Sequence, residues 1–373
     1  MNALTEKQKM LQRQSLPLEA KIEMTKKRVR EWYDHWDGDV YLSLSFGKDS
    51  FVLYDIIKSM NIEIPSVFSN TGLEMPEIVK FGREIIKNDP SIEEIRPKKH
   101  FKEVWEKEGI PLVSKKVARM VRTLQGGSEG RENTYRLYDT GINSQGVFCK
   151  NWKLPNKWRS LVSSEIKMSE KCCDYLKKEP IKTYQKRSGR QGITAMMADE
   201  GGYRGGMTTC NQYTAKNPMS SPMLFWTEAD IWEYVDTKNL EICHVYYERI
   251  YDSEGELIWC ATPHWKGEPE PTGYRVVFQG DDYQILELGD ELHYRISGEP
   301  RTGCMFCAFG VHLDKGLNRF QRMKISHPRQ HRVITERMDL GSALQLIDVK
   351  FIPEGVGDNT LFENNQMDLL GDK

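Results

Sequence analysis

The residues that could do chemistry begin with the segment SFGKDS at positions 45–50. A glycine lets the backbone approach a ligand closely, and free N–H groups at a helix N-terminus donate to phosphate. Lys48 adds a positive charge, the hydroxyls of Ser45 and Ser50 add donors, and Asp49 is a candidate ligand of Mg²⁺. The glycine and the GK pair lack the spacing of a Walker loop. We therefore expect a phosphate-binding turn of another kind.

The cysteines supply a second chemistry. Eight are present, and four of them fall into two pairs, Cys172-Cys173 and Cys304-Met305-Phe306-Cys307. Adjacent thiolates take two corners of one zinc tetrahedron only with strain, but they can reach different irons of a cubane cluster. The four thiols therefore favour a 4Fe-4S cluster, with a structural zinc site and unligated thiols as alternatives. If only three of the four ligate, one iron is left open to bind sulfide.

A third candidate pair is Glu200 and Arg204, which follow a predicted strand and flank Gly201-Gly202. The four-residue spacing also suits a helical ion pair, but the two glycines favour a loop. We expect Glu200 to contact the nucleotide and Arg204 to meet a phosphate or a second substrate.

These residues need a scaffold, and alternating strand and helix patterns predict one. The expected strands cover residues 39–45, 65–70, 92–96 and 191–198, and the expected helices cover 16–37, 49–60, 75–87, 101–108, 166–187 and 231–238. Residues 110–165 show no regular pattern. Short apolar strands that alternate with helices are typical of an α/β fold with a doubly wound parallel sheet. Such a sheet binds ligands at the carboxyl ends of its strands.

Changes of pattern along the chain predict four segments. They are an N-terminal helical segment (1–37), a nucleotide-binding α/β domain (38–245), a region with a small β-meander insertion and the CxxC pair (246–337), and an acidic C-terminal tail (338–373). The meander is expected at 272–296, where three alternating runs are separated by GDD and GDE.

The charge of −1, from 53 basic and 54 acidic residues, hides strong local differences. Residues 150–190 carry twelve Lys and Arg against four Asp and Glu, and residues 315–337 carry seven against one. Basic clusters attract polyanions such as nucleotides or nucleic acid, although a solvated helix face has the same composition. The chain shows neither an 18-residue apolar run nor an apolar leader, so we expect no membrane partner and a cytoplasmic location, where thiols stay reduced.

The motifs, taken in order, resemble a known family. SFGKDS after a buried strand resembles the pyrophosphate loop (PP-loop) of N-type ATP pyrophosphatases, and FSNTGLEMPE at 68–77 is similar to the DTGxxFPE segment of the phosphoadenylyl-sulfate (PAPS) reductase family. The adjacent cysteines, the ExxxR pair, the WTEADIW stretch at 226–232 and the CxxC pair follow in the family's order. The resemblance covers roughly residues 38–315.

This resemblance implies an adenine nucleotide alpha hydrolase-like fold with ATP, Mg²⁺ and a 4Fe-4S cluster. It implies that the nucleotide is bound by Ser45, Phe46, Gly47, Lys48, Asp49, Ser50, Asn70, Thr71, Gly72, Glu74 and Glu200. It makes Lys48, Asp49 and Arg204 the candidate catalytic residues, and Cys172, Cys173, Cys304 and Cys307 the candidate metal ligands. Asn70 stands where the family has an aspartate.

Two departures bear on the reaction. Reductases of the resembled family lack the loop lysine, which this chain keeps as Lys48, and they use a cysteine in a C-terminal tail, whereas no cysteine follows Cys307. We therefore expect an ATP-dependent, pyrophosphate-releasing adenylyltransferase or sulfurtransferase with an iron-sulfur cluster. Its candidate partners are DNA or tRNA as the acceptor and a cysteine desulfurase or another sulfur donor. The alternatives are a PAPS or adenylyl-sulfate reductase that releases sulfite, and a non-catalytic, nucleotide-sensing regulator that binds DNA.

Overall fold

A six-stranded sheet forms the centre of the protein. The computed structural model describes residues 5–202, 204–251, 257–261, 274–278, 283–288, 291–296 and 298–353. The sheet has the order β3-β2-β1-β5-β7-β6, and all its neighbours pair in parallel except β6 and β7. Its strands are β1 (Val40–Ser43), β2 (Ser66–Ser69), β3 (Ile92–Ile95), β5 (Gln191–Ile193), β6 (Asn211–Gln212) and β7 (Met219–Ser220). The predicted mostly parallel α/β sheet is confirmed.

Helices cover both faces of this sheet, because its strands bury side chains on both sides. On one face, Tyr41 of β1 packs its ring 4.9 Å from that of Tyr184 in α8, while its neighbour Leu42 joins the main core on the other face. The surrounding helices are α3 (Lys48–Lys58), α4 (Pro76–Asn88), α5 (Phe101–Glu108), α8 (Glu179–Ser188) and α9 (Glu228–Lys238). Each expected helix in these regions is therefore present, with ends shifted by a few residues or, for α8, with a start thirteen residues later.

The segment between 110 and 165 is more regular than its sequence indicates. It contains the short strand β4 (Leu112–Val113), α6 (Lys115–Gln125), α7 (Glu132–Thr140) and the 3₁₀ turns η1 (Lys150–Trp152) and η2 (Asn156–Val162). Ser114 caps α6 by accepting from the N–H of Val117, and the helix buries one apolar stripe. The expectation of an irregular segment was wrong because the glycines after α6 and α7 end real helices rather than mark a long loop.

The expected helix at 166–187 begins later. Residues 166–168 instead run as extended chain, where the N–H of Ile110 donates to Lys167 O and the N–H of Met168 donates to Gln125 Oε1. Helical structure starts with a π-helical turn, η3 (Asp174–Lys178), and continues as α8. The predicted helix at 16–37 is present as α2 (Leu18–His35), and a further helix that was not predicted, α1 (Glu6–Gln14), precedes it across Pro17.

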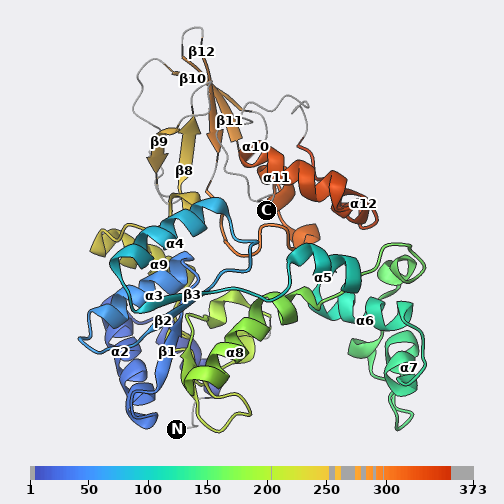
Figure 1. Ribbon diagram of the computed structural model, residues 1–373, viewed down its shortest axis with the longest axis horizontal. Helices are drawn as coiled ribbons and strands as arrows, with labels where there is room; N and C mark the ends of the chain where they lie inside the picture. The colour runs from blue at the N-terminus through green and yellow to red at the C-terminus, as the bar shows by residue number, and fades with distance from the viewer. Residues whose placement is uncertain are drawn as a thin grey trace.

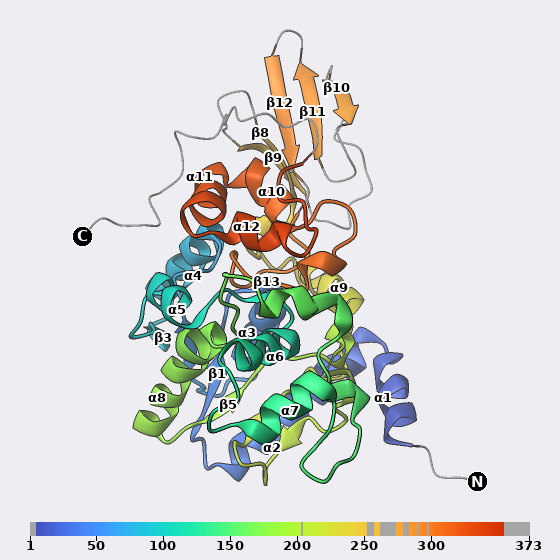
Figure 2. The same ribbon diagram turned by 90° about the vertical axis from the view of Figure 1, so that its right-hand side faces the viewer.

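A second sheet lies beyond the C-terminal side of the first. Its order is β10-β11-β12-β8-β9, all antiparallel, which confirms a meander at 274–296 and extends it by two strands. The strands are β8 (Glu248–Tyr251), β9 (Leu257–Ala261), β10 (Tyr274–Phe278), β11 (Tyr283–Leu288) and β12 (Glu291–Ile296). Figures 1 and 2 show β10–β12 projecting from the body beside α10–α12.

The chain then returns to the body. β13 (Ala308–Phe309) pairs in parallel with β4, and the elements that follow are η7 (Val311–Leu313), α10 (Arg319–Ser326), α11 (Pro328–Arg332), the π-helical turn η8 (Val333–Arg337) and α12 (Leu340–Gln345). Leu340, Ala343 and Leu344 are buried, so the first residues of the predicted acidic tail pack in the core. Residues 354–373 lie outside the described residues.

The N-terminal helices are tied to α9 by a buried ion pair. Lys21 Nζ lies 2.7 and 2.6 Å from the two carboxylate oxygens of Asp230 and donates to Gln14 O at 2.6 Å. Asp230 also accepts from the N–H of Thr227, in the capping box that begins α9. Breaking such a pair leaves an uncompensated buried charge, so α2 is firmly attached. Within the described residues, no helix has both the length and the apolar character needed to cross a membrane.

Candidate nucleotide cavity and cysteine group

The segment 45–50 forms the turn between β1 and α3. Its left-handed residue is Phe46, with φ 56°, and not the glycine. The Phe46 ring is fully buried, with its centroid 4.9 Å from that of Phe68, and a Cβ added to Gly82 would lie 2.4 Å from it. The buried ring thus fixes an unfavourable backbone conformation at the start of the loop, and Gly82 makes room for it.

Gly47 is required for close approach. Its φ is −69°, but an added Cβ would lie 3.1 Å from both Thr302 Oγ1 and Tyr246 Oη. Gly47 caps α3, and the N–H of Lys48 donates to Tyr246 Oη at 3.1 Å. The loop therefore packs against residues from two distant segments, which leaves the N-terminus of α3 at the edge of a cavity.

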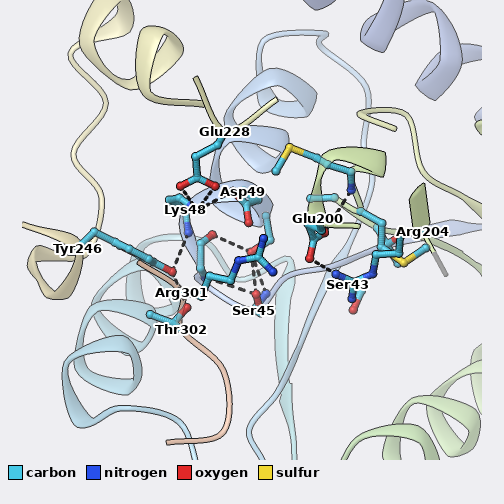
Figure 3. A pocket seen from close by; sticks show the side chains of 16 residues that line it. Ser43, Ser45, Lys48, Asp49, Glu200, Arg204, Glu228, Tyr246, Arg301 and Thr302 are labelled. Atoms are coloured by element: carbon cyan, nitrogen blue, oxygen red, sulfur yellow. Dashed lines mark hydrogen bonds and ion pairs between the residues drawn. The ribbon is translucent and has the colours of Figure 1, made fainter. Parts of the chain in front are cut away.

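This cavity has a volume of about 320 Å³ and lies at the carboxyl ends of β1 and β5, as expected for a doubly wound sheet (Figure 3). It is lined by Ser43, Ser45, Gly47, Lys48, Asp49, Ser50, Thr194, Ala195, Met196, Met197, Glu200, Arg204, Glu228, Tyr246, Arg301 and Thr302. The structure thus brings together seven of the residues expected from the sequence, namely Ser45, Gly47, Lys48, Asp49, Ser50, Glu200 and Arg204. Phe46 supports the loop from beneath.

Lys48 is the central cation of the cavity. Its side chain is 2% exposed, and its Nζ lies 3.0 Å from Glu228 Oε1 and 3.2 Å from Asp49 Oδ1. The rings of Tyr246 and Trp232 face the same ammonium group, with centroids at 5.7 and 5.9 Å. Figure 3 shows Lys48 beside both carboxylates, so its position is fixed without a ligand.

Asp49 supplies a buried oxygen that needs a partner. Its Oδ1 is buried and receives no hydrogen bond, since the contact with Lys48 lacks hydrogen-bond geometry. Loss of hydration raises the pKa of Asp49, the charge of Lys48 opposes this rise, and Glu228 adds to it. Two carboxylates, one with an unpaired oxygen, beside a phosphate-sized cavity fit Mg²⁺, which uses one or two protein carboxylates together with substrate phosphates.

Two arginines complete the charged wall. Arg204 contacts Glu200, and Glu200 accepts from the N–H of Met197 at 3.2 Å. Burial lowers the pKa of Arg204, and the nearby charge of Arg301 lowers it further. Two like charges held close together create a site for an anion. Arg301, Glu228, Tyr246 and Thr302 were missed by sequence reasoning. Two sequence features could have indicated them: Arg301-Thr302 stands just before the CxxC pair, and Glu228 lies in the first turn of α9.

The residues from Asn70 to Glu74 lie elsewhere. They form the loop after β2 and do not line the cavity. Asn70 donates to Glu94 at 2.8 Å, and Glu74 accepts from the N–H and the hydroxyl of Thr71 at 2.8 and 2.9 Å. Their polar groups thus hold the loop itself together. Their assignment to nucleotide binding, like that of Gly72, stays a prediction.

This loop faces the four paired cysteines, which we call the cysteine group. The Thr71 hydroxyl lies 3.9 Å from Cys304 Sγ, and the N–H of Met305 donates to Leu73 O at 2.7 Å. Arg319 Nη1 donates to the carbonyls of Cys304 and Cys307, both at 3.1 Å. The turn of the CxxC pair is therefore fixed from both sides.

All four thiols influence one another, although the two pairs are about 130 residues apart in the chain. A hydrogen bond with Cys173 raises the pKa of Cys172, and burial and the charges of Cys173, Cys307 and Cys304 raise it further. The hydrogen bond from Cys172 lowers the pKa of Cys173 to about 6, helped by the charges of Lys115 and Lys177. Burial raises the pKa of Cys304 to about 11. Cys173 is therefore the thiolate of the group at neutral pH.

The donor set suits a soft metal centre, because four thiols and no carboxylate or imidazole define it. The structure shows all four as free thiols, with a hydrogen bond between Cys172 and Cys173. In the described part of the chain, no group of three or more His, Cys, Asp or Glu side chains has the arrangement of a metal site. The chemistry of the group fits a cluster, and its assembled geometry is not shown.

This chain is similar to known proteins. The family model described as "Phosphoadenosine phosphosulfate reductase domain" matches residues 39–126 and 136–307. The chain is similar to an adenosine 5'-phosphosulfate reductase of Anoxybacillus flavithermus, with 24% identity over 242 residues that cover 62% of this chain and 76% of the relative. A crystal structure of a phosphoadenylyl-sulfate reductase from Candida auris, in a phosphate complex, matches 62% of this chain and 91% of its own at 14% identity, with a TM-score of 0.34.

Proposed function

This chain belongs to the phosphoadenosine phosphosulfate reductase domain family, and we propose that its cavity binds the phosphates of an adenine nucleotide and breaks the bond between the α- and β-phosphates. The observation that carries the proposal is the charge arrangement around Lys48. A helix N-terminus and three cations, Lys48, Arg204 and Arg301, surround a space of about 320 Å³. Asp49, Glu228 and Glu200 pair with Lys48 and Arg204, so phosphates that carry Mg²⁺ suit this wall better than a bare anion does.

In the proposed reaction, an acceptor oxygen attacks the α-phosphorus of ATP, and the bond to the bridging oxygen breaks, so that pyrophosphate leaves. Lys48 and the N–H groups at the start of α3 neutralise the charge that develops on the leaving pyrophosphate. Asp49 and Glu228 would hold Mg²⁺, which lowers the charge of the phosphates when it is bound. Arg204 and Arg301 orient the α-phosphate on the opposite wall.

The cysteine group gives the proposed enzyme its sulfur chemistry. Cys172, Cys173, Cys304 and Cys307 would hold a 4Fe-4S cluster, which supplies a binding site for sulfide or a source of electrons. Lys177 and Lys115 stabilise negative charge on Cys173, and Arg319 holds the CxxC turn. A single residue of chain, Gly303, connects this group to the cavity, because Thr302 lines the cavity and Cys304 follows Gly303. We place this chemistry in the cytosol, where thiols stay reduced.

A second candidate function is the reduction of adenylyl sulfate or PAPS to sulfite. The family description and the name of the Anoxybacillus relative favour it. A thiolate would attack the sulfur and displace the nucleotide, and a second thiol would then release sulfite. Cys173 offers a thiolate at neutral pH. The two carboxylates beside the buried Lys48, Asp49 and Glu228, favour the first candidate because they suit the Mg²⁺ that accompanies ATP.

One set of measurements separates these functions. Protein purified without oxygen is assayed, with DNA or tRNA present as the acceptor, for Mg²⁺-dependent exchange of labelled pyrophosphate into ATP. It is also assayed for sulfite release from adenylyl sulfate or PAPS with thioredoxin or dithiothreitol. We expect exchange and no sulfite. Sulfite without exchange would establish the reductase, and nucleotide binding without either reaction would establish a nucleotide sensor. Iron and sulfide analysis tests the cluster separately, and zinc without iron would refute it.

A further inference from the structure

The most unusual exposed surface lies at the carboxyl end of α7, far from the cavity in the chain. Val147, Phe148 and Trp152 are 55%, 59% and 44% exposed, although large apolar side chains are normally buried. The Trp152 ring stacks on Tyr138 at 6.3 Å with 14° between the planes. Phe148 packs against Gly141, where an added Cβ would lie 2.6 Å from its ring. These contacts hold two partly exposed aromatic rings in fixed positions.

Cations surround these rings. Lys116 Nζ lies 5.1 Å from the centroid of Trp152, and Arg159 pairs with Asp139 at the end of α7. The Lys153 side chain lies beside Phe148 at Gly141. Across residues 114–160, ten Lys and Arg oppose three acidic residues, Glu129, Glu132 and Asp139. This stretch therefore has a formal charge of plus seven, of which Arg119 and Arg122 pair with Glu170 outside it.

We propose that this surface, formed by Lys116, Phe148, Trp152, Lys153 and Arg159, binds single-stranded nucleic acid. Bases stack on exposed aromatic rings irrespective of sequence, and neighbouring lysines and arginines contact the phosphates. A duplex hides the faces of its bases, so the rings select unpaired nucleotides. An acidic protein would satisfy the cations but would leave the flat rings without a matching surface.

The surface also leads to the cysteine group. Lys115 and Lys116 are neighbours in the first turn of α6, and Lys115 contacts the thiol of Cys173 while Lys116 lies over Trp152. Figure 2 shows α6 and α7 next to each other on the same side of the molecule. A strand stacked on Trp152 would thus reach the cysteine group within a few nucleotides. As an assignment of the acceptor, this inference rests on the proposed function, whereas the binding surface itself does not.

The test is a titration of fluorescein-labelled, 20-nucleotide oligothymidylate and oligouridylate with the full chain, followed by anisotropy without ATP. We expect binding that weakens steeply with salt and prefers the single strand at least about tenfold over a duplex of the same length. Phe148→Ala with Trp152→Ala should weaken binding about tenfold or more, and Trp152→Phe should restore part of the loss. Leu346→Ala, which removes a side chain 43% exposed on α12, is the apolar control and should change nothing.

The charge arm uses a matched pair of variants. Lys116→Ala with Lys153→Ala should weaken binding about tenfold and reduce its salt dependence, while Lys182→Ala with Lys186→Ala removes the same charge from α8 and should have little effect. Equal oligonucleotide binding by the two double lysine variants would overturn the proposal. Unchanged binding by the variant that lacks both aromatic rings would overturn it as well. Pyrophosphate exchange measured in parallel keeps this result separate from the proposed function. If the protein binds the oligonucleotide but shows no pyrophosphate exchange, the proposed reaction is contradicted. If it shows exchange but does not bind the oligonucleotide, the proposed surface is contradicted.

Discussion

The nucleotide cavity and the cysteine group lie at the same end of the central sheet, but they are built in different ways. The cavity loop is local: six consecutive residues turn from β1 into α3, and Phe46, Gly47 and Ser50 fix its shape. The cysteine group is assembled from two segments about 130 residues apart, and Leu73, Thr71 and Arg319 hold its CxxC pair. Cys172 and Cys173 hydrogen-bond to each other, whereas Lys48 is held at the cavity wall by two carboxylates.

This difference indicates which site depends on a ligand for its order. The cavity has its charges paired and its lysine positioned before any nucleotide arrives, as preorganised electrostatic catalysis requires. The cysteine group combines a thiolate, a raised thiol pKa and a buried lysine, an arrangement that a metal or an oxidant would change. The two sites should therefore respond separately to substitution, and four experiments test this.

The largest effect is expected from Lys48→Ala. Removing one preorganised charge from a phosphoryl-transfer site costs about 10²- to 10³-fold in rate, so pyrophosphate exchange should fall by that factor. The alkylation rate of Cys173 should stay unchanged. Lys58→Ala, at the other end of α3, is the matched control, because its ammonium group contacts Asp89 outside the cavity. A loss of less than about threefold for Lys48→Ala would show that this lysine has no part in the reaction.

The second experiment examines the thiols alone. In metal-free protein, iodoacetamide should alkylate Cys173 with a rate that rises through about pH 6, because the thiolate forms as the pH passes its pKa. At pH 7 it should react at least about 100-fold faster than Cys304, whose pKa is raised to about 11. Mass spectrometry of digests measures both rates. Lys177→Met removes a stabilising charge and should move the Cys173 midpoint to higher pH, and an unmoved midpoint would contradict this role.

The third experiment separates the two carboxylates of the cavity. Glu228→Gln removes a contact of Lys48 and a candidate Mg²⁺ ligand, and kcat/KM should fall about tenfold, the effect typical of an outer metal contact. Because Glu228 raises the pKa of Asp49, its loss should also move the acidic limb of the pH profile to lower pH. Glu233→Gln, on the exposed face of α9, is the control. If the acidic limb moves to higher pH instead, the proposed effect of Glu228 on the pKa of Asp49 is excluded.

The smallest effects are expected from two glycines. Gly47→Ala adds a Cβ 3.1 Å from Thr302 and Tyr246, so the nucleotide KM should rise a few-fold with little change in stability. Gly310→Ala introduces a side chain at φ 85° beside the CxxC pair, with open space around it, and should lower the free energy of unfolding by about 1 kcal/mol without changing the KM. Urea denaturation and steady-state kinetics measure the two. A changed KM in Gly310→Ala together with a lowered free energy of unfolding in Gly47→Ala would show that the two sites are mechanically linked.

The same contrast explains how far the sequence could predict this molecule. The strands of the parallel sheet and the loop at 45–50 are encoded locally, by apolar runs and by a motif whose residues remain neighbours in space. The segment 110–165 was misread because α6 and α7 are short, polar on one side and separated by glycines. The apolar residues of α6, Val117, Met120, Val121 and Leu124, have helical spacing, a local pattern that the prediction overlooked. α7 buries one side chain, Tyr138, so its helical state depends on tertiary packing.

The site residues follow the same rule. Lys48 and Asp49 were predicted because they follow a strand in one motif, and Arg204 because of its ExxxR spacing. The strand expected at 191–198 ends at Ile193, so Arg204 lies eleven residues beyond it. Glu228 and Arg301 were not, because α9 and the segment before the CxxC pair reach the cavity only through the folded chain. In the other direction, Asn70, Thr71 and Glu74 match a motif, but the structure places them in a loop that faces the cysteines. The order of the motifs in the sequence therefore identified the motifs, but it did not predict which of them line the same cavity.

The buried pair of Lys21 and Asp230 affects how this protein can be divided. The family model begins at residue 39, which suggests that the chain could be shortened to that point for expression or transplantation. Without α2, however, Asp230 would keep its charge in an apolar environment at the start of α9, two residues after the carboxylate that holds Lys48. A fragment trimmed to the matched region would therefore carry a disturbed Lys48. The smallest transplantable unit of this protein begins upstream of Leu18.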